Sequence, residues 1–552
     1  MTPSDRIRVL LTELYPDHAD VLFRTIGERL RKVYVPPAQG DYFSEKTITL
    51  ITYGDSLRRA DEAPLRILHG FLNSHINGEI DTVHLLPFYP YSSDDGFSVI
   101  DYYAVNPELG RWDDVQALSD DYRLMFDAVI NHMSAKSEWF ARFLADDPDF
   151  AHLFMTEHPE NDLSAVVRPR TSPLLTAFTK PDGRTVHVWT TFSDDQVDLD
   201  YRAPSTFLRI LDVLLFYVEQ GAQVIRLDAI AFMWKIAGTT SLHLPQTHAV
   251  IKLFRAVLDV IAPHVILITE TNVPHAENIS YLGADEAQLV YNFTLPPLLL
   301  HTLITGKAVK LAAWINSLPA PTPRTTFFNF TASHDGIGVR PVEGILSAND
   351  LADMIAHVEA NGGRVSYRSL PDGSKKPYEL NITYVDAAGK PGISPDEHVK
   401  RFLLTQAVML ALAGVPAIYI HSLLGTRNDA EGVDRLGYNR AINRAKLDAD
   451  ALQAELGTDG TFRNRVFSGY KRLLAERRAG SAFHPLGDQR AFTLNGGVVL
   501  GVDRRSPDGA ERVICLFNFG DRAETVMHAA VGTVELRPYE WRWIATASDP
   551  VR

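Results

Sequence analysis

Eight short apolar segments recur along this chain, and the stretches between them are long enough to form helices. The predicted strands are residues 48–53, 83–88, 124–130, 224–228, 265–269, 289–293, 327–333 and 417–420. Strands that alternate with helices pair in parallel, because each connection has to return to the starting edge of the sheet. Eight such units predict an α/β fold, the (β/α)8 or TIM barrel, whose active sites lie at the carboxyl ends of the strands.

Three kinds of segment lie outside this alternation. Residues 1–46 predict an N-terminal extension of two helices followed by a linker. The catalytic barrel then takes residues 47–132 and 204–483, with an insertion lobe at 133–203 after the third strand and a second insertion at 336–397 after the seventh. Both insertions leave the carboxyl ends of strands, so they are expected to cover the barrel mouth. Short β-favouring segments within residues 484–552 predict an all-β C-terminal domain.

Charged and polar residues finish four of the predicted strands. They are His132 after the third strand, Arg226 and Asp228 at the fourth, Glu270 at the fifth, and His334 with Asp335 at the seventh. One such strand end, taken alone, is compatible with a structural ion pair. Four that meet at one barrel mouth predict a shared pocket instead, and it contains the carboxylates that retaining glycoside chemistry requires.

The overall composition limits the partners that this chain is expected to have. It contains 54 Lys and Arg against 68 Asp and Glu, for a formal net charge of −14. Nucleic acids and membrane surfaces favour basic patches, so neither is an expected partner. Cys515 is the only cysteine, which excludes an internal disulfide and a cysteine-based metal site. The N-terminus has no signal-peptide core and no apolar run is long enough to span a membrane, so the expected location is cytoplasmic.

Several longer motifs carry a resemblance to a known family. They are LPFYPYSSDDGFSVIDY at 86–102, VRPR at 167–170, TETNVPH at 269–275, HDGIG at 334–338 and GYNRAINR at 437–444. Together they resemble the sucrose-phosphorylase subfamily of glycoside hydrolase family 13, the α-amylase superfamily, over nearly the whole chain after the N-terminal extension. The extension and residues 162–170 are most similar to the glucosylglycerate phosphorylases of that subfamily.

The resemblance implies a role for each matched position. Asp228 would be the nucleophile that forms a β-glucosyl ester, Glu270 the general acid and then the base, and Asp335 the group that stabilises the oxocarbenium-like transition state. The glucose would be held by Arg226, His132 and His334, by Phe97 stacking on the ring, and by Asp94 paired with Arg440. No cofactor and no metal ion are implied, so activity is expected to survive chelators.

The group that attacks the glucosyl ester decides between a hydrolase and a phosphorylase. The resemblance implies a phosphate and acceptor subsite made of Arg168, Arg170, Phe192, Gln196, Lys376 and Tyr378. The planar fork of arginine suits phosphate oxygens, and two prolines stiffen the basic loop at 167–170. An exposed basic loop, and with it a hydrolase or transglucosidase, is the alternative interpretation.

Extra positive charge near this subsite indicates what kind of acceptor the enzyme uses. Lys375 and Lys376 precede Tyr378, and such charge suits an anionic acceptor, glycerate or fructose 6-phosphate, better than neutral fructose. The alternative is that both lysines solvate a turn. The predicted function is reversible phosphorolysis of a small α-glucoside to α-glucose 1-phosphate. The first donor is 2-O-α-glucosylglycerate, followed by sucrose 6-phosphate and sucrose.

Two further hypotheses differ in class. A catalytically inactive barrel that binds or regulates would not need the three acids, all of which are present. A metal-dependent enzyme would need ligand spacing on one helix, which the sequence lacks. The expected partners are therefore a small glucoside and inorganic phosphate, and the sequence leaves open whether the chain is a monomer or a homodimer.

Overall fold

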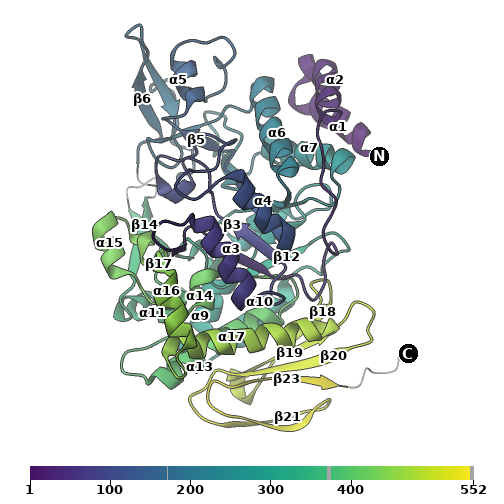
Figure 1. The fold of residues 1–552 in the computed structure, drawn as a ribbon, viewed down its shortest axis with the longest axis vertical. Helices are drawn as coiled ribbons and strands as arrows, with labels where there is room; N and C mark the ends of the chain where they lie inside the picture. The colour runs from purple at the N-terminus through teal and green to yellow at the C-terminus, as the bar shows by residue number, and fades with distance from the viewer. Residues whose placement is uncertain (171, 370–373, 547–552) are drawn as a thin grey trace.

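The computed structural model describes residues 1–170, 172–369 and 374–546, and its centre is a closed barrel of eight parallel strands (Figure 1). All eight predicted strands are present, so the fold-class prediction is confirmed. Around the barrel the strands follow chain order: β1 (Thr49–Thr52), β3 (Thr82–Leu85), β4 (Arg123–Ala128), β9 (Ala222–Leu227), β10 (Ile266–Thr269), β11 (Leu289–Tyr291), β12 (Thr326–Phe330) and β16 (Val415–Tyr419).

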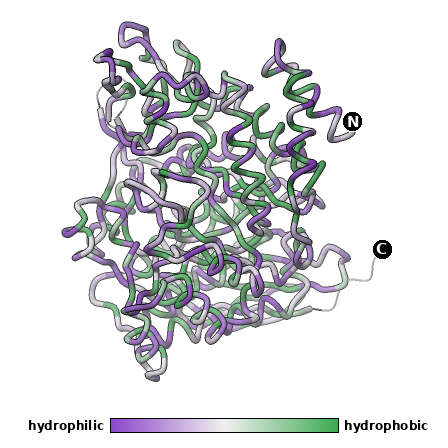
Figure 2. The backbone as a smooth tube through the Cα atoms, turned by 45° about the horizontal axis from the view of Figure 1, so that its top comes forward, coloured by the Kyte–Doolittle hydropathy of each residue, from purple (hydrophilic) through white to green (hydrophobic). Residues whose placement is uncertain are grey.

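The barrel strands are buried on both faces. Every residue of β9, including Arg226, is buried, because one face fills the barrel interior and the other is covered by helices. Figure 2 shows the apolar segments of the chain concentrated in the interior of the molecule. The main connecting helices are α3 (Pro64–His75), α4 (Trp112–Asp121), α6 (Pro204–Glu219), α7 (Pro245–Ile261), α9 (Leu295–Thr305), α10 (Val309–Ser317), α13 (Pro395–Ala411) and α17 (Phe462–Ala479).

Both long insertions contain their own small antiparallel sheets. The segment after β4 contains α5 (Glu138–Leu144), the hairpin of β6 (Leu175–Thr179) with β7 (Thr185–Trp189), and the pair of β5 (His132–Ser134) with β8 (Gln196–Asp198). The segment after β12 contains α11 (Ala348–Ala360) and a sheet of β13 (Ile337–Gly338), β15 (Lys375–Asn381) and β14 (Arg364–Ser369). The residue bounds of the domains predicted from the sequence stay a prediction.

A four-stranded sheet forms the C-terminal part, in the order β18 (Asp488–Leu494), β19 (Val499–Arg505), β20 (Arg512–Asn518) and β23 (Trp541–Thr546). The pair β21 (Glu524–His528) and β22 (Gly532–Leu536) packs beside it, and β23 is a strand that the sequence reading missed. Buried Arg504 joins this part to the barrel by donating hydrogen bonds to the carbonyls of Ala411 at 2.9 Å and His484 at 2.8 Å. In Figure 1 this sheet lies at the opposite end of the molecule from the hairpin β6–β7.

Two N-terminal helices lie on the outside of the barrel (Figure 1): α1 (Pro3–Leu14) packs against α7, and α2 (Ala19–Leu30) packs against α1. They meet at the predicted junction Tyr15-Pro16-Asp17, and Thr2 caps α1 by accepting a hydrogen bond from the backbone N–H of Asp5. The Tyr15 hydroxyl donates to the Tyr201 carbonyl at 2.8 Å. The extension is therefore part of the folded core rather than an appendage.

Leu11→Ala is expected to lower the free energy of unfolding by about 2–5 kcal/mol, because Leu11 is fully buried and its loss leaves a cavity between helices. The measurement is the midpoint of thermal denaturation. Val9→Ala is the matched control, since Val9 lies on the same helix and is 52% exposed. Equal midpoints for the two variants would show that α1 contributes no core to the fold.

One further property of the fold concerns membranes. Within the described ranges, no helix is both long enough and apolar enough to cross a bilayer.

Candidate active site

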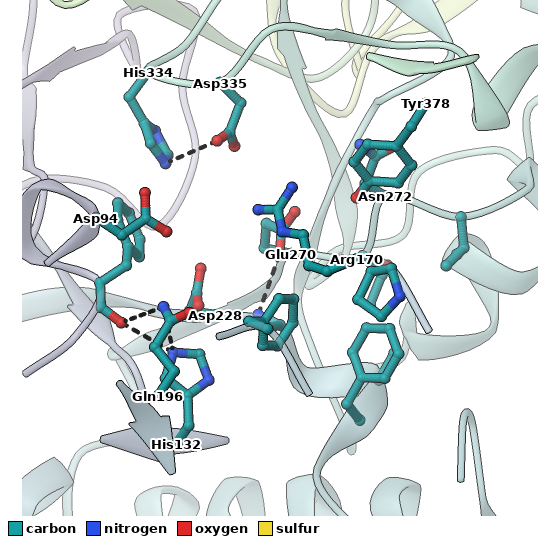
Figure 3. Close-up of a pocket in the computed structure, with 18 of the residues that line it drawn as sticks. Asp94, His132, Arg170, Gln196, Asp228, Glu270, Asn272, His334, Asp335 and Tyr378 are labelled. Atoms are coloured by element: carbon teal, nitrogen blue, oxygen red, sulfur yellow. Dashed lines mark hydrogen bonds and ion pairs between the residues drawn. The ribbon is translucent and has the colours of Figure 1, made fainter. Parts of the chain in front are cut away.

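A cavity with about 680 Å³ of space opens at the carboxyl ends of the barrel strands (Figure 3). All but two of the residues predicted for the site line it: Asp94, Phe97, His132, Arg170, Phe192, Gln196, Arg226, Asp228, Glu270, His334, Asp335, Tyr378 and Arg440. Figure 3 shows Asp94, His132 and His334 on one side of Glu270, and Arg170, Asn272 and Tyr378 on the other.

Arg226 lies in β9 and Asp228 directly follows this strand, and both residues line the cavity. The guanidinium of Arg226 donates to Asp228 Oδ1 at 2.7 Å and also pairs with Asp127, which in turn contacts His84 at 2.6 Å. Burial raises the pKa of Asp228, and Arg226 is the largest influence that lowers it. The arginine thus favours the ionised carboxylate that a nucleophile requires.

The chain turns sharply after Asp228. Ala229 has a left-handed backbone with φ of 49°, which is uncommon for a residue with a side chain, and its N–H donates to Glu270 Oε2 at 3.1 Å. Burial, followed by the negative charges of Asp228 and Asp335, raises the pKa of Glu270 to about 7. This carboxyl group can therefore carry a proton near neutral pH and also release it, which is what an acid–base catalyst needs.

Asp335 lies at the end of β12 among cations. Arg440 pairs with it at 2.6 Å, and His334 Nε2 lies 3.4 Å from the same carboxylate oxygen. Although burial raises it, the positive charge of Arg440 above all, with smaller effects from Arg444 and Arg226, holds the pKa of Asp335 well below its usual range. Asp335 is therefore a fixed negative charge. Burial also lowers the pKa of His334, so its imidazole is neutral.

Asp94 and Arg440 do not form a direct ion pair in this structure, although the charge of Asp94, after those of Asp335 and Glu379, raises the pKa of Arg440. Asp94 lies 3.6 Å from Arg444, while Arg440 Nε donates to Glu379 Oε2 at 3.1 Å. Glu379 is buried and also accepts a hydrogen bond from the Gly336 N–H at 2.7 Å. It therefore competes for Arg440, and the sequence reading gave this acid no role.

Phe97 is held by its neighbours as one wall of the cavity. Its ring stacks on His334, with 4.6 Å between centroids and 8° between planes, and its carbonyl accepts a hydrogen bond from Gln196 Nε2 at 3.0 Å. His132 Nε2 lies 2.9 Å from the same carbonyl. The turn before Phe97 requires glycine, because Gly96 has φ of +111° and an added Cβ would lie 2.6 Å from the Pro87 carbonyl.

Tyr378 reaches the cavity because β15 is irregular at this position. Ser366 pairs with Glu379 and the next residue, Tyr367, pairs with Pro377, so Tyr378 is the extra residue of a β-bulge. A bulge re-aims a side chain, and here it directs the Tyr378 ring to within 6.0 Å of the Arg170 guanidinium. The strand alternation that would put Lys376 on the same side as Tyr378 is interrupted.

Lys376 and Arg168 are the two predicted residues that do not line the cavity. Lys376 is exposed and borders a separate surface hollow, so the expectation that it adds charge to this cavity is wrong. Lys375 is also exposed, as expected of residues that solvate a turn. Arg168 is half-buried beside the cavity and is likewise absent from its lining.

Eight of the lining residues had no predicted role in the site, among them Asn272 and Arg340. Asn272 follows Glu270 inside a quoted motif, and Arg340 follows Asp335 by five residues. The signal was present for Asn272, since every second residue after a barrel strand can face the mouth. Nothing in the sequence separated Arg340 from an exposed arginine. Across residues 1–170, 172–369 and 374–546, no group of three or more His, Cys, Asp or Glu side chains is placed to hold a metal ion.

Comparisons with known proteins agree with this geometry. Residues 78–335 match the catalytic-domain model of α-amylase. The chain is 48% identical to a glucosylglycerate phosphorylase of Spirochaeta thermophila, over 94% of this chain and 89% of the relative. It is 32% identical to a sucrose phosphorylase of Agrobacterium vitis, over 72% of this chain and 82% of the relative.

A solved structure supports the same fold. The sucrose 6F-phosphate phosphorylase from Thermoanaerobacter thermosaccharolyticum superposes with a TM-score of 0.76 at 23% identity, covering 89% of this chain and 98% of that one. Fold, motif order and near-full-length identity agree. The chain therefore belongs to the α-amylase superfamily, glycoside hydrolase family 13, and within it to the sucrose-phosphorylase subfamily.

Proposed function

We propose that this enzyme is a retaining α-glucosyl phosphorylase that converts 2-O-α-glucosylglycerate and phosphate into α-glucose 1-phosphate and glycerate. The observation that carries the proposal is one cavity that holds both halves of the chemistry. Asp228, Glu270 and Asp335 line it together with Arg170 and Tyr378. A hydrolase would need only the acids, whereas an arginine beside them suits an anionic nucleophile.

In the first step a carboxylate oxygen of Asp228 attacks the anomeric carbon from the β face. The bond to the glycosidic oxygen breaks, and Glu270 protonates that oxygen so that glycerate leaves as an alcohol. Positive charge develops on the glucose ring, and the ionised Asp335 and the electron-rich face of Phe97 lie in the same cavity to stabilise it.

In the second step a phosphate oxygen attacks the anomeric carbon from the α face and releases Asp228. Two inversions give α-glucose 1-phosphate, with retention overall. Esterification of Asp228 removes one of the negative charges that raise the pKa of Glu270, so the ionised Glu270 is favoured while the ester exists. Glu270 then takes up the proton of the incoming hydrogen phosphate.

The acid role of Glu270 sets a pH dependence. Because the pKa of Glu270 is raised to about 7 and the first step needs its protonated form, kcat/KM for glucosylglycerate is expected to fall as pH rises through about 7. The measurement is kcat/KM from pH 5 to 9 at saturating phosphate. If Glu270→Gln showed the same fall of kcat/KM as pH rises through about 7, the group that titrates would not be Glu270.

Two features favour glucosylglycerate as the donor. Identity to the glucosylglycerate phosphorylase exceeds identity to the sucrose phosphorylase, 48% against 32%, and two arginines that line the cavity, Arg170 and Arg340, have no acidic partner among the described residues. Sucrose 6-phosphate and sucrose follow as donors. We further propose that the enzyme binds only small molecules and is a monomer or a homodimer. We also propose a cytoplasmic location, because a single buried cysteine, Cys515, suits a reducing compartment.

The test is release of glucose 1-phosphate from glucosylglycerate, sucrose 6-phosphate and sucrose, each with and without phosphate. Phosphate-dependent release from glucosylglycerate in preference to the other two is the expected result. Release of free glucose at a rate independent of phosphate would instead identify a hydrolase. Phosphate-dependent release from sucrose alone would keep the phosphorylase and reject the anionic acceptor.

A further inference from the structure

Arg340 is a buried cation on the acceptor side of the cavity. Its side chain lines the cavity, and the residue is only 9% exposed. Its Nε is fully enclosed and has no hydrogen-bond partner, and no described residue forms an ion pair or hydrogen bond with its guanidinium. A buried, unpaired guanidinium is costly in a folded protein, so its presence calls for a ligand.

The other arginines of the cavity are accounted for by the glucose-binding machinery or by phosphate. Arg226 pairs with Asp127 and Asp228, and Arg440 pairs with Asp335 and Glu379. Arg170 has no acidic partner among the described residues and is the residue proposed above for phosphate. Among the described residues, Arg340 is therefore a second cavity arginine without an acidic partner, beside the one proposed for phosphate.

Two hydrogen bonds of its chain neighbours fix the position of Arg340. It begins a short 3-10 helix, Arg340–Val342, directly after β13, and the N–H of Val339 donates to the Tyr378 carbonyl at 3.1 Å. Thr294 Oγ1 donates to the Pro341 carbonyl at 3.3 Å. Arg340 thus stands on a rigid element beside the Tyr378 bulge, as a residue that discriminates between ligands should.

Asn272 lies against the same wall. An added Cβ on Gly338 would lie 2.6 Å from Asn272 Oδ1, so the glycine makes room for this amide, whose Oδ1 has no partner. In Figure 3 Asn272 lies beside Tyr378. An amide next to a free guanidinium offers hydrogen bonds to a small hydroxy acid, the chemistry of glycerate.

We infer that Arg340 binds the carboxylate of the acceptor and makes the enzyme selective for glycerate over neutral polyols. The inference rests on the proposed phosphorylase function and assigns its acceptor specificity to one residue. Burial, followed by the nearby Arg368, lowers the pKa of Arg340, although the more distant charges of Glu343 and Glu277 act in the opposite direction without forming a direct pair among the described residues. A neutral acceptor leaves this charge uncompensated, whereas a carboxylate pairs with both arms of the fork.

The experiment runs the reaction in the synthetic direction, with glucose 1-phosphate as the donor and phosphate release as the readout. Arg340→Gln is expected to raise the KM for D-glycerate at least about 30-fold, since truncating one partner of a buried charge pair weakens binding by that order. The KM for glycerol should not rise. Arg340→Lys should recover part of the affinity, because it restores the charge without the fork.

A second assay separates the acceptor from phosphate. Phosphate-dependent turnover of α-glucosyl fluoride involves no carboxylate acceptor, so Arg340→Gln should leave its kcat and its phosphate KM unchanged. Arg368→Gln is the matched control, because Arg368 is a neighbouring arginine that pairs with Glu343 at 3.1 Å and does not line the cavity. It should keep wild-type values for glycerate.

Each outcome is decisive. A wild-type glycerate KM in Arg340→Gln would overturn the inference, and so would a phosphate KM that rises as much as the glycerate KM, which would make Arg340 a phosphate ligand. Misfolding is monitored by thermal denaturation, where removal of an unpaired buried charge should not lower the midpoint. If the wild-type enzyme itself rejects glycerate but releases glucose 1-phosphate from another donor, the proposed donor fails and the acceptor assignment falls with it.

Discussion

Asp228→Asn is expected to reduce phosphorolysis at least about 10⁴-fold while the fold stays intact. The amide cannot form the glucosyl ester, and it removes the negative charge that faces the developing cation. The fold should persist because Arg226 keeps its second partner, Asp127, and the asparagine fills the same space. Initial rates with glucosylglycerate and phosphate, alongside thermal denaturation, measure both effects.

Asp353→Asn is the matched control for this variant. Asp353 is an exposed residue of α11 outside the cavity, so the same chemical change there should leave the rate unaltered. With donor present and phosphate omitted, the wild-type enzyme should gain the mass of one glucosyl unit, and Asp228→Asn should not. An active Asp228→Asn would reject Asp228 as the nucleophile and revive the inactive-barrel hypothesis.

The barrel and the acids at its mouth could be predicted from the sequence because local patterns determine them. A continuous apolar run such as 265–268 fits a strand buried on both faces, and a charged residue just past its carboxyl end can face the mouth. Asp228, Glu270 and Asp335 follow from this rule alone. The missed β23 contains alternating Trp and Arg within a short segment, so its apolar content did not distinguish it from a turn.

The acceptor side could not be predicted because it depends on contacts between distant segments. The bulge at Tyr378 arises from its pairing with β14 and reverses the side on which Lys376 lies. Likewise, Arg440 forms an ion pair with Glu379, and the arginine within ion-pair distance of Asp94 is Arg444. The positive charge that the sequence placed on Lys376 is absent from the cavity, and the cation that lines it instead, Arg340, comes from a segment that carries no motif of its own.

Glu270→Gln should show an effect that depends on the leaving group. Glucosylglycerate phosphorolysis is expected to fall about 10²–10⁴-fold, because the departing glycerate oxygen is no longer protonated. Fluoride leaves without a proton, so α-glucosyl fluoride should still form the ester on Asp228. Phosphate enters as an anion and needs little help from a base. Phosphate-dependent turnover of the fluoride should therefore be reduced far less than turnover of glucosylglycerate.

Glucosyl transfer by Glu270→Gln to two different acceptors gives the complementary measurement. With α-glucosyl fluoride as donor, transfer to the hydroxyl of glycerate requires a base and should be lost, while transfer to phosphate survives. Glu277→Gln is the matched control, since Glu277 lies on α8 (His275–Asn278), close in the chain but outside the cavity lining. Equal losses for glycerate and phosphate would show that Glu270 acts by holding the glucosyl ring rather than by moving a proton. A selective loss with glycerate assigns proton transfer to this carboxyl group, whose pKa near 7 suits both directions of the reaction.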